Sequence, residues 1–164
     1  MPDSAPHHPT DKADSAFVRA AGLVLDTVTA TEVRGHLDVG ADHHTPWGIV
    51  HGGVYTAAIE SAASVAASAA VRERGQFAVG VSNITNFLRP VTAGRLTVTA
   101  SPVQQGRTLQ LWSVSIVRED GKLVADGQVR LQNVPLPAAP GNNRSTSSSK
   151  PPLDGGTSYF ALKK

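Results

Sequence analysis

Apolar and polar residues alternate along several stretches of this chain, as they do in half-buried β-strands. The alternation is clearest over residues 31–39, where Val33, Gly35, Leu37 and Val39 share one side. We predict six strands, over residues 23–28, 31–39, 77–88, 94–103, 108–118 and 122–132. The first two are expected to form a hairpin that turns at Thr29-Ala30, and Asp120-Gly121 is the strongest hairpin signal between the last two.

Residues 52–74 follow a helical pattern instead. This stretch is rich in Ala, which favours helices, and an apolar face is formed by Tyr55, Ile59, Ala62, Ala66 and Ala70. Gly75 is a suitable stop, and Arg72 and Arg74 lie in the last turn, where cations are favoured. A second, short helix is predicted over residues 16–21, capped by Ser15 and stopped by Gly22.

The predicted order is therefore two strands, one long helix and four more strands. A run of antiparallel strands needs something to cover one face, and a helix of 20 residues is roughly 30 Å long. We predict an α+β fold in which a sheet of six strands curls around the helix. The folded domain is expected to span residues 15–134, between a disordered segment, 1–14, and a flexible Pro/Gly/Ser-rich tail, 135–164.

Composition excludes several classes of function. The net charge is only +2 and the basic residues are scattered, so no nucleic-acid partner is expected. Residues 54–71 have the length of a membrane span, but they are mostly Ala and Ser and contain Glu60, which favours a buried helix over a membrane segment. The polar start of the chain has no signal-peptide core, so we expect a cytoplasmic protein.

Metal and cofactor chemistry are not expected either. The chain has no Cys, and the adjacent His43 and His44 lack partners at ligand spacing. The sequence therefore predicts no metal site and no cofactor.

Glu60 is the candidate reactive group. It is the only charged side chain from Gly52 to Val71, and a carboxylate is costly to bury without partners. One interpretation is structural, with the carboxylate satisfied by Thr56, Ser64 or a neighbouring backbone group. The other is chemical, with Glu60 acting as a nucleophile or general base.

Several motifs surround Glu60 in the sequence. They are Trp-Gly-Ile-Val-His-Gly-Gly-Val-Tyr at residues 47–55, Val-Gly-Val-Ser-Asn at 79–83, Asn-Phe-Leu-Arg-Pro-Val at 86–91, and more loosely 106–108 and 127–129. With these motifs, residues 16–134 resemble the hotdog-fold acyl-CoA thioesterases of the phenylacetate-pathway and 4-hydroxybenzoyl-CoA thioesterase type. The resemblance implies a hotdog fold, a curved antiparallel sheet wrapped around one central helix, and an aryl- or medium-chain acyl-CoA substrate.

The resemblance also implies roles for individual residues. Glu60 matches the acid that attacks the thioester or activates water, and the Gly52 N–H matches the group that binds the thioester carbonyl. Ser64 matches the residue that helps to place the water or the carboxylate. Contacts to CoA are implied at three residues in two turns, Arg89, Arg107 and Thr108, although ordinary exposed turn arginines remain an equal interpretation.

One position departs from the family pattern. Many members have Asn or Gln six residues before the His of the His-Gly-Gly motif, whereas this chain has Thr45. A Thr hydroxyl can still donate a hydrogen bond, but over a shorter reach. We therefore expect the rate or the preferred substrate to differ.

The residues themselves are suited to thioester hydrolysis. A helix N-terminus offers free N–H groups to a developing oxyanion, and Gly52 and Gly53 are expected to let a substrate approach them. His51 is expected to shape this loop by a hydrogen bond rather than to react. We expect Trp47 to pack against the domain, with acyl recognition as a second role.

The spacing of these groups bears on assembly. Seven residues separate Gly53 from Glu60, which is about 10 Å along a helix axis, and a Glu side chain spans only part of that distance. We therefore predict an active site shared across a two-fold dimer, in which each Glu60 faces the other chain's Gly52. The resemblance implies the same arrangement, often with two dimers in a tetramer.

Two alternatives stay open at this point. The chain is also compatible with a non-catalytic acyl-CoA-binding protein that uses the same groove. A hydratase or dehydratase acting on acyl thioesters is the other, because such enzymes combine a His with an acid, as His51 and Glu60 do here.

Overall fold

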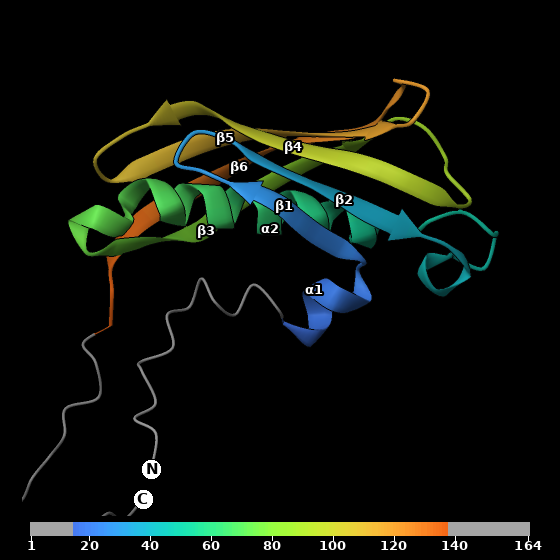
Figure 1. Cartoon of the computed structure of the whole chain (residues 1–164), viewed down its shortest axis with the longest axis horizontal. Coiled ribbons are helices and arrows are strands. Elements are labelled where there is room, and N and C mark those ends of the chain that lie inside the picture. Colours follow the sequence, from blue (N-terminus) through green and yellow to red (C-terminus); the bar gives the residue numbers. More distant parts are fainter. Residues whose placement is uncertain (1–14, 138–164) are drawn as a thin grey trace, which may run out of the picture.

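The computed structural model describes residues 15–137 of the chain (Figure 1). Its elements, in order, are α1 (Ala16–Ala20), β1 (Leu23–Val28), β2 (Val33–Val39), η2 (Ala41–His43), α2 (Gly52–Val71), η3 (Arg72–Arg74), β3 (Gln76–Phe87), β4 (Gly94–Gln105), β5 (Leu109–Arg118) and β6 (Leu123–Pro135). The predicted strands and helices are all present. The predicted N-terminal segment and nearly all of the predicted tail lie outside the described residues.

The six strands form a single antiparallel sheet in the order β1-β2-β4-β5-β6-β3. Helix α2 lies along one face of this sheet (Figure 1). This arrangement confirms the predicted hotdog fold. It leaves β1 and β3 as the two edge strands, each with one side free of neighbouring strands among residues 15–137.

Small side chains bring α2 close to the sheet. Five alanines of the helix are completely buried, Ala58, Ala62, Ala63, Ala66 and Ala67. Opposite them, the inward residues of the strands are large, such as Leu37, Trp112 and Leu131, which are also completely buried. This pairing of a small helix face with a large sheet face fills the core with few aromatic residues.

The long helix begins and ends where the sequence indicates. His51 is its N-cap and Gly75 closes the short η3 turn behind it, with a φ of 65° that favours Gly. Residues 52–74 are also long and apolar enough to cross a membrane, but half of the 18-residue window that meets this criterion is buried inside the protein. Its apolar composition is thus explained by the core that it forms with the sheet.

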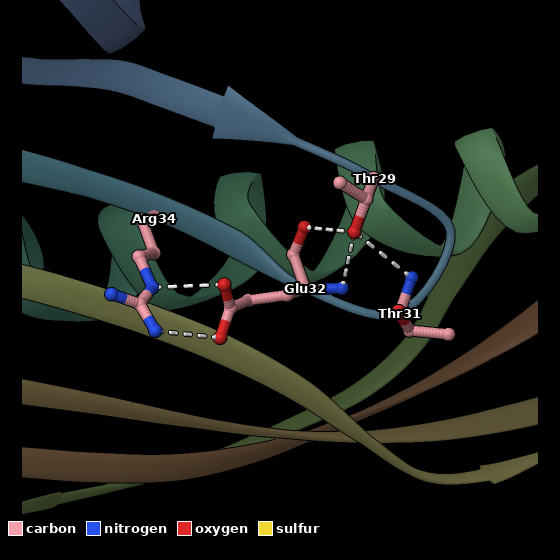
Figure 2. A network of polar contacts seen from close by, with 4 residues as sticks. All are labelled: Thr29, Thr31, Glu32 and Arg34. Atoms are coloured by element: carbon pink, nitrogen blue, oxygen red, sulfur yellow. Dashed lines mark hydrogen bonds and ion pairs between the residues drawn. The ribbon is translucent and has the colours of Figure 1, made fainter.

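The β1–β2 turn shows how the polar residues between strands are used (Figure 2). The Thr29 hydroxyl donates to the Glu32 carbonyl at 2.9 Å and accepts from the Glu32 N–H at 2.8 Å. The Glu32 carboxylate in turn accepts from the Arg34 guanidinium at 2.8 and 3.1 Å. The hairpin predicted at Thr29-Ala30 is confirmed, and Thr29 is the residue that closes it.

A buried polar network ties the far end of α2 to the sheet. The Gln110 amide N–H₂ donates to the Ala67 carbonyl at 2.9 Å and to Asn133 Oδ1 at 2.7 Å. Gln110 Oε1 accepts from the Trp112 indole at 2.9 Å. Asn133 Nδ2 then donates to the Gly106 and Arg107 carbonyls at 3.1 Å each, which holds the β4–β5 turn. The Gln110 amide therefore joins the helix to β5 and β6, and through Asn133 the network extends to the β4–β5 turn.

Replacing this amide is expected to destabilise the fold. Gln110→Leu leaves the Trp112 N–H, Asn133 Oδ1 and the Ala67 carbonyl buried without these partners, so we expect a loss of about 3 kcal/mol in the free energy of unfolding. Urea unfolding at one fixed protein concentration measures this loss. Gln104→Leu, at an exposed position on β4, is the control and should stay within about 0.5 kcal/mol of wild type. Equal stability of the two variants would contradict the role given to the network.

Candidate active site

The N-terminus of α2 presents one free backbone N–H. The Gly53 N–H donates to His51 Nδ1 at 2.8 Å, and the Val54 N–H donates to the His51 carbonyl at 3.0 Å. Within residues 15–137, no acceptor is recorded for the Gly52 N–H. Because Nδ1 of His51 accepts, the proton of the neutral ring lies on Nε2. His51 thus caps the helix, and Gly52 rather than Gly53 has an N–H available to a ligand.

Gly52 is one of the residues that line a cavity of about 510 Å³. The cavity brings together five of the residues predicted for the site, Thr45, His51, Gly52, Gly53 and Arg89. The other lining residues are apolar or aromatic, Ile49, Val50, Tyr55, Phe87, Leu88 and Pro90. A largely apolar pocket with a few polar groups at one end is typical of a small-molecule site.

Gly52 and Gly53 are required because neighbouring side chains pack against them. This corrects the expectation that they leave room for a substrate to approach the helix N-terminus. A Cβ on Gly52 would lie 3.0 Å from the Phe87 ring, and one on Gly53 would lie 2.9 Å from His51 Nδ1. The space beside each Cα is therefore filled by the protein itself, not left open to a substrate. Glycine is needed here so that Phe87 and His51 can pack on the helix start.

Tyr55 forms part of the cavity wall and is almost completely buried, with 3% of its surface exposed. Its ring lies 6.3 Å from that of Phe87, centroid to centroid. Burial raises the pKa of Tyr55 to about 12, so the hydroxyl stays protonated at neutral pH. Within the described part of the chain this hydroxyl has no hydrogen-bond partner.

Thr45 is partly engaged by its own loop. Its hydroxyl oxygen accepts from the Trp47 N–H at 3.3 Å, which leaves the O–H free to donate. Trp47 itself is 84% exposed, so the expectation that it packs against its own domain is wrong. Trp47 lies in a tight turn, in which the Gly48 N–H donates to the Thr45 carbonyl at 3.0 Å and Gly48 adopts a left-handed φ of 77°.

Glu60 is half-buried between α2 and β3. Its Oε2 accepts from Asn83 Nδ2 at 2.9 Å, and the Ser64 hydroxyl lies 3.5 Å from Oε1, at the limit of a hydrogen bond. Thr56 does not reach the carboxylate, because its hydroxyl donates to the Gly52 carbonyl at 3.2 Å. Asn83 is the principal partner; it ends the motif at residues 79–83, but the sequence analysis assigned it no role beside Glu60.

The carboxylate also depends on Gly80. A Cβ at this position would lie 2.3 Å from Glu60 Oε1, which is far closer than any real contact. Gly80 therefore leaves the space that the carboxylate occupies. Glu60 is not among the residues that line the Gly52 cavity, in keeping with the separation expected along the helix.

The residues predicted to contact CoA lie at two ends of the domain. Arg89 donates to the Leu123 carbonyl at 2.6 Å, near the start of β6. Arg107 and Thr108 lie in the β4–β5 turn, next to Leu109, which pairs with Gln132 near the end of β6. Nine residues of strand separate Leu123 from Gln132, or roughly 30 Å. One chain by itself therefore does not bring Arg89 together with Arg107 and Thr108.

Comparison with known proteins identifies the family. Residues 48–125 match the family model described as the thioesterase superfamily. Rv1847 of Mycobacterium tuberculosis is 43% identical over 136 residues, which cover 81% of this chain and 94% of that protein. Its solved structure superposes with a TM-score of 0.73, at 41% identity, over 76% of this chain and 100% of that chain.

Two further relatives have more specific names. The 1,4-dihydroxy-2-naphthoyl-CoA hydrolase of Listeria monocytogenes is 31% identical over 103 residues, 63% of this chain and 83% of that protein. The structure of the phenylacetic acid degradation protein PaaI of Thermus thermophilus is similar at a TM-score of 0.65 and 32% identity, over 72% of this chain and 98% of that chain. The chain therefore belongs to the thioesterase superfamily and is a hotdog-fold thioester hydrolase.

Proposed function

We propose that this protein hydrolyses an aryl- or medium-chain acyl-CoA of the cytoplasm to the free acid and CoA. The observation that carries the proposal is the free Gly52 N–H, which lies at a helix N-terminus in the wall of a largely apolar cavity. Such an N–H stabilises the oxyanion that forms when a thioester carbonyl is attacked. The apolar wall suits an acyl group, and the Listeria relative is named as the hydrolase of an aryl-CoA.

Glu60 supplies the second half of the reaction. As a general base it takes a proton from water, the water oxygen attacks the carbonyl carbon, and the C–S bond breaks as the proton passes to the CoA sulfur. As a nucleophile its carboxylate oxygen attacks the carbonyl carbon and the C–S bond breaks to release the CoA thiolate, and water then hydrolyses the mixed anhydride to the free acid and the Glu60 carboxylate, with a proton of the water passing to the thiolate. In both routes the Gly52 N–H binds the carbonyl oxygen.

We further propose that the site is completed by a second copy of the chain. Thr56 lies four residues from both Gly52 and Glu60, so a two-fold axis at its level would place each Glu60 opposite the partner's Gly52. The edge strand β3 offers a surface for this pairing, because Val79, Val81 and Ile84 on it are exposed apolar residues. Two such dimers would form the tetramer that the family resemblance implies.

The same pairing accounts for the separated CoA residues. If two β3 strands pair antiparallel, the β4–β5 turn of one chain lies toward the end of the partner that carries Arg89. Arg107 and Thr108 of one protomer would then reach a CoA whose thioester lies in the partner's cavity. Two arginines from different chains would share the phosphates of one CoA.

The first test removes the carboxylate. Glu60→Ala is expected to lower kcat by roughly 100-fold or more, as the loss of a general base or nucleophile does. Release of free thiol from a panel of benzoyl-, phenylacetyl- and hexanoyl-CoA measures it. Glu73→Ala, which removes an exposed carboxylate just behind the same helix, is the matched control and should behave like wild type.

Four results would overturn the assignment. No turnover of any thioester by the wild type would remove the thioesterase reaction, and binding without turnover would favour an acyl-CoA-binding protein. Hydration of an unsaturated acyl-CoA without thiol release would favour a hydratase. Full turnover by Glu60→Ala would displace Glu60 from the reaction.

A second test concerns the shared site and uses Gly52→Pro. Proline removes the free N–H but is tolerated at the first helical position, and the ψ of 133° at His51 suits a residue before proline. We expect kcat to fall roughly 100- to 1000-fold. Gly52→Ala keeps the N–H while adding the same contact with Phe87, so it isolates the effect of the N–H from that of the Cβ.

Mixed oligomers then locate the site. Glu60→Ala and Gly52→Pro chains are co-expressed with different tags and purified through both. A shared site predicts recovery to about half of wild-type activity, because one of the two sites of each mixed dimer combines an intact Gly52 with an intact Glu60. If both groups act within one chain, the mixed oligomer stays as inactive as its parents.

A third test concerns the space below the carboxylate. Gly80→Ala places a methyl group where Glu60 Oε1 now lies, so the carboxylate must move and kcat should fall roughly 10- to 100-fold. The same thiol-release assay measures this, and thermal unfolding should stay near wild type. Gly40→Ala is the control, because a Cβ there meets nothing within 4 Å. Unchanged activity of Gly80→Ala would show that the position of Glu60 is not needed.

A further inference from the structure

Asn83, the last residue of the motif at 79–83, makes the shortest hydrogen bond to the Glu60 carboxylate within residues 15–137. Its Nδ2 donates to Glu60 Oε2 at 2.9 Å and also lies 3.3 Å from the Thr56 carbonyl. Its Oδ1 accepts from the Thr85 hydroxyl at 2.7 Å. These contacts determine which way the amide points, because the reversed amide would set its oxygen against both the carboxylate and the Thr56 carbonyl.

A bulge in β3 makes this arrangement possible. Side chains three residues apart on a regular strand point to opposite faces, yet Gly80 and Asn83 both face Glu60. The pairing of β3 with β6 passes from Gly80–Leu131 directly to Ser82–Arg130, so Val81 is an extra residue on β3. Because of the bulge, Asn83, Thr85 and Phe87 lie on the face of the sheet that carries α2, whereas in a regular strand they would lie on the opposite face from Gly80.

The outward residues of the same strand confirm the change of face. Ile84 and Asn86 line a shallow pocket on the opposite side of the sheet, and the Asn86 amide donates there to Asp126 at 2.9 Å. Asn83 and Asn86 are thus chemically alike and three residues apart, but only Asn83 faces the helix. The strand itself supplies a matched control for a test of Asn83.

We propose that Asn83, held by Thr85, is a positioning residue that fixes the orientation of the Glu60 carboxylate during thioester hydrolysis. This inference rests on the proposed function of Glu60. Oε2 is held by Asn83, whereas Oε1 lies over Gly80 and has, among residues 15–137, only the Ser64 hydroxyl at 3.5 Å as a hydrogen-bond donor, so Oε1 is the oxygen assigned to act on water or the thioester. The Thr85 hydroxyl donates to Asn83 Oδ1 and so keeps the N–H₂ group of the amide directed toward Glu60. Asn83 therefore donates to the Glu60 carboxylate throughout the reaction.

The test compares substitutions at Asn83 and Thr85. Asn83→Leu removes the donor at similar size and is expected to lower kcat roughly 10- to 100-fold with little change in KM. Asn83→Asp, which sets a second carboxylate against Glu60, is expected to be worse than Asn83→Leu. Thr85→Val should lower kcat roughly three- to tenfold, and Thr85→Ser, which keeps the hydroxyl, should restore it. Asn86→Leu should leave kcat and KM at wild-type values.

A double-mutant cycle separates positioning from other effects. In a Glu60→Ala background, Asn83→Leu should cause no further loss, because its effect passes through Glu60. Thermal unfolding and size-exclusion elution of each variant should match wild type, since a purely structural role would alter them. A wild-type kcat for Asn83→Leu, or a further loss in the Glu60→Ala background, would overturn the inference.

The outcomes also separate this inference from the function on which it rests. If wild type releases no thiol, or Glu60→Ala is fully active, the proposed function is wrong. If Glu60→Ala is inactive while Asn83→Leu is unaffected, the function stands and only the role of Asn83 falls.

Discussion

The close approach of α2 to the sheet is the constraint on which the rest of the structure depends. Completely buried alanines line the sheet side of the helix, and large side chains of the strands fill the space that they leave. A bulkier helix face would lift α2 away from β3. Glu60 could then no longer lie over Gly80 or reach the amide of Asn83, because these contacts occur at hydrogen-bond distance. The same packing therefore forms the core and sets the carboxylate.

The helix also keeps its two chemical features apart. Its N-terminus has a free N–H in an apolar cavity, whereas its carboxylate lies two turns further on and outside that cavity. A rigid helix keeps this distance fixed, which is why the proposed site draws the Gly52 N–H and the Glu60 carboxylate from two different chains. In the proposed dimer each helix contributes its start to one reaction and its middle to another. In this proposal, thioester hydrolysis requires the dimer.

Most of the fold was accessible from the sequence because alternation and helical spacing report directly on burial. The strands, the long helix and the hairpins at Thr29 and Asp120 follow from such local patterns. The site was accessible in part. Glu60 is conspicuous as a lone charge, and the His-Gly-Gly motif indicates a helix start, but Asn83 looks like any other polar residue in a strand.

The missed features share one physical cause: they depend on contacts between distant residues. The bulge at Val81 moves every later side chain of β3 to the opposite face of the sheet from the one that regular alternation predicts. No local sequence pattern indicates this extra residue. The packing of Phe87 on Gly52 and the exposure of Trp47 likewise depend on how β3 and the loop before α2 fold back. The separation of Arg89 from Arg107 follows from sheet register, which residue spacing does not reveal.

The position of β3 at the edge of the sheet has a consequence for how such a protein can diverge. Its inward residues hold the carboxylate, and in the proposed dimer its free edge joins the two chains. A substitution there faces selection for catalysis and for assembly together, which narrows the changes that the strand can accept. The loop from Gly40 to Val50 contributes to the cavity wall, but it neither holds the Glu60 carboxylate nor belongs to the edge that joins the chains in the proposed dimer. A substitution in that loop, such as the departure at Thr45, can therefore alter the cavity wall without moving the Glu60 carboxylate or the free edge of β3.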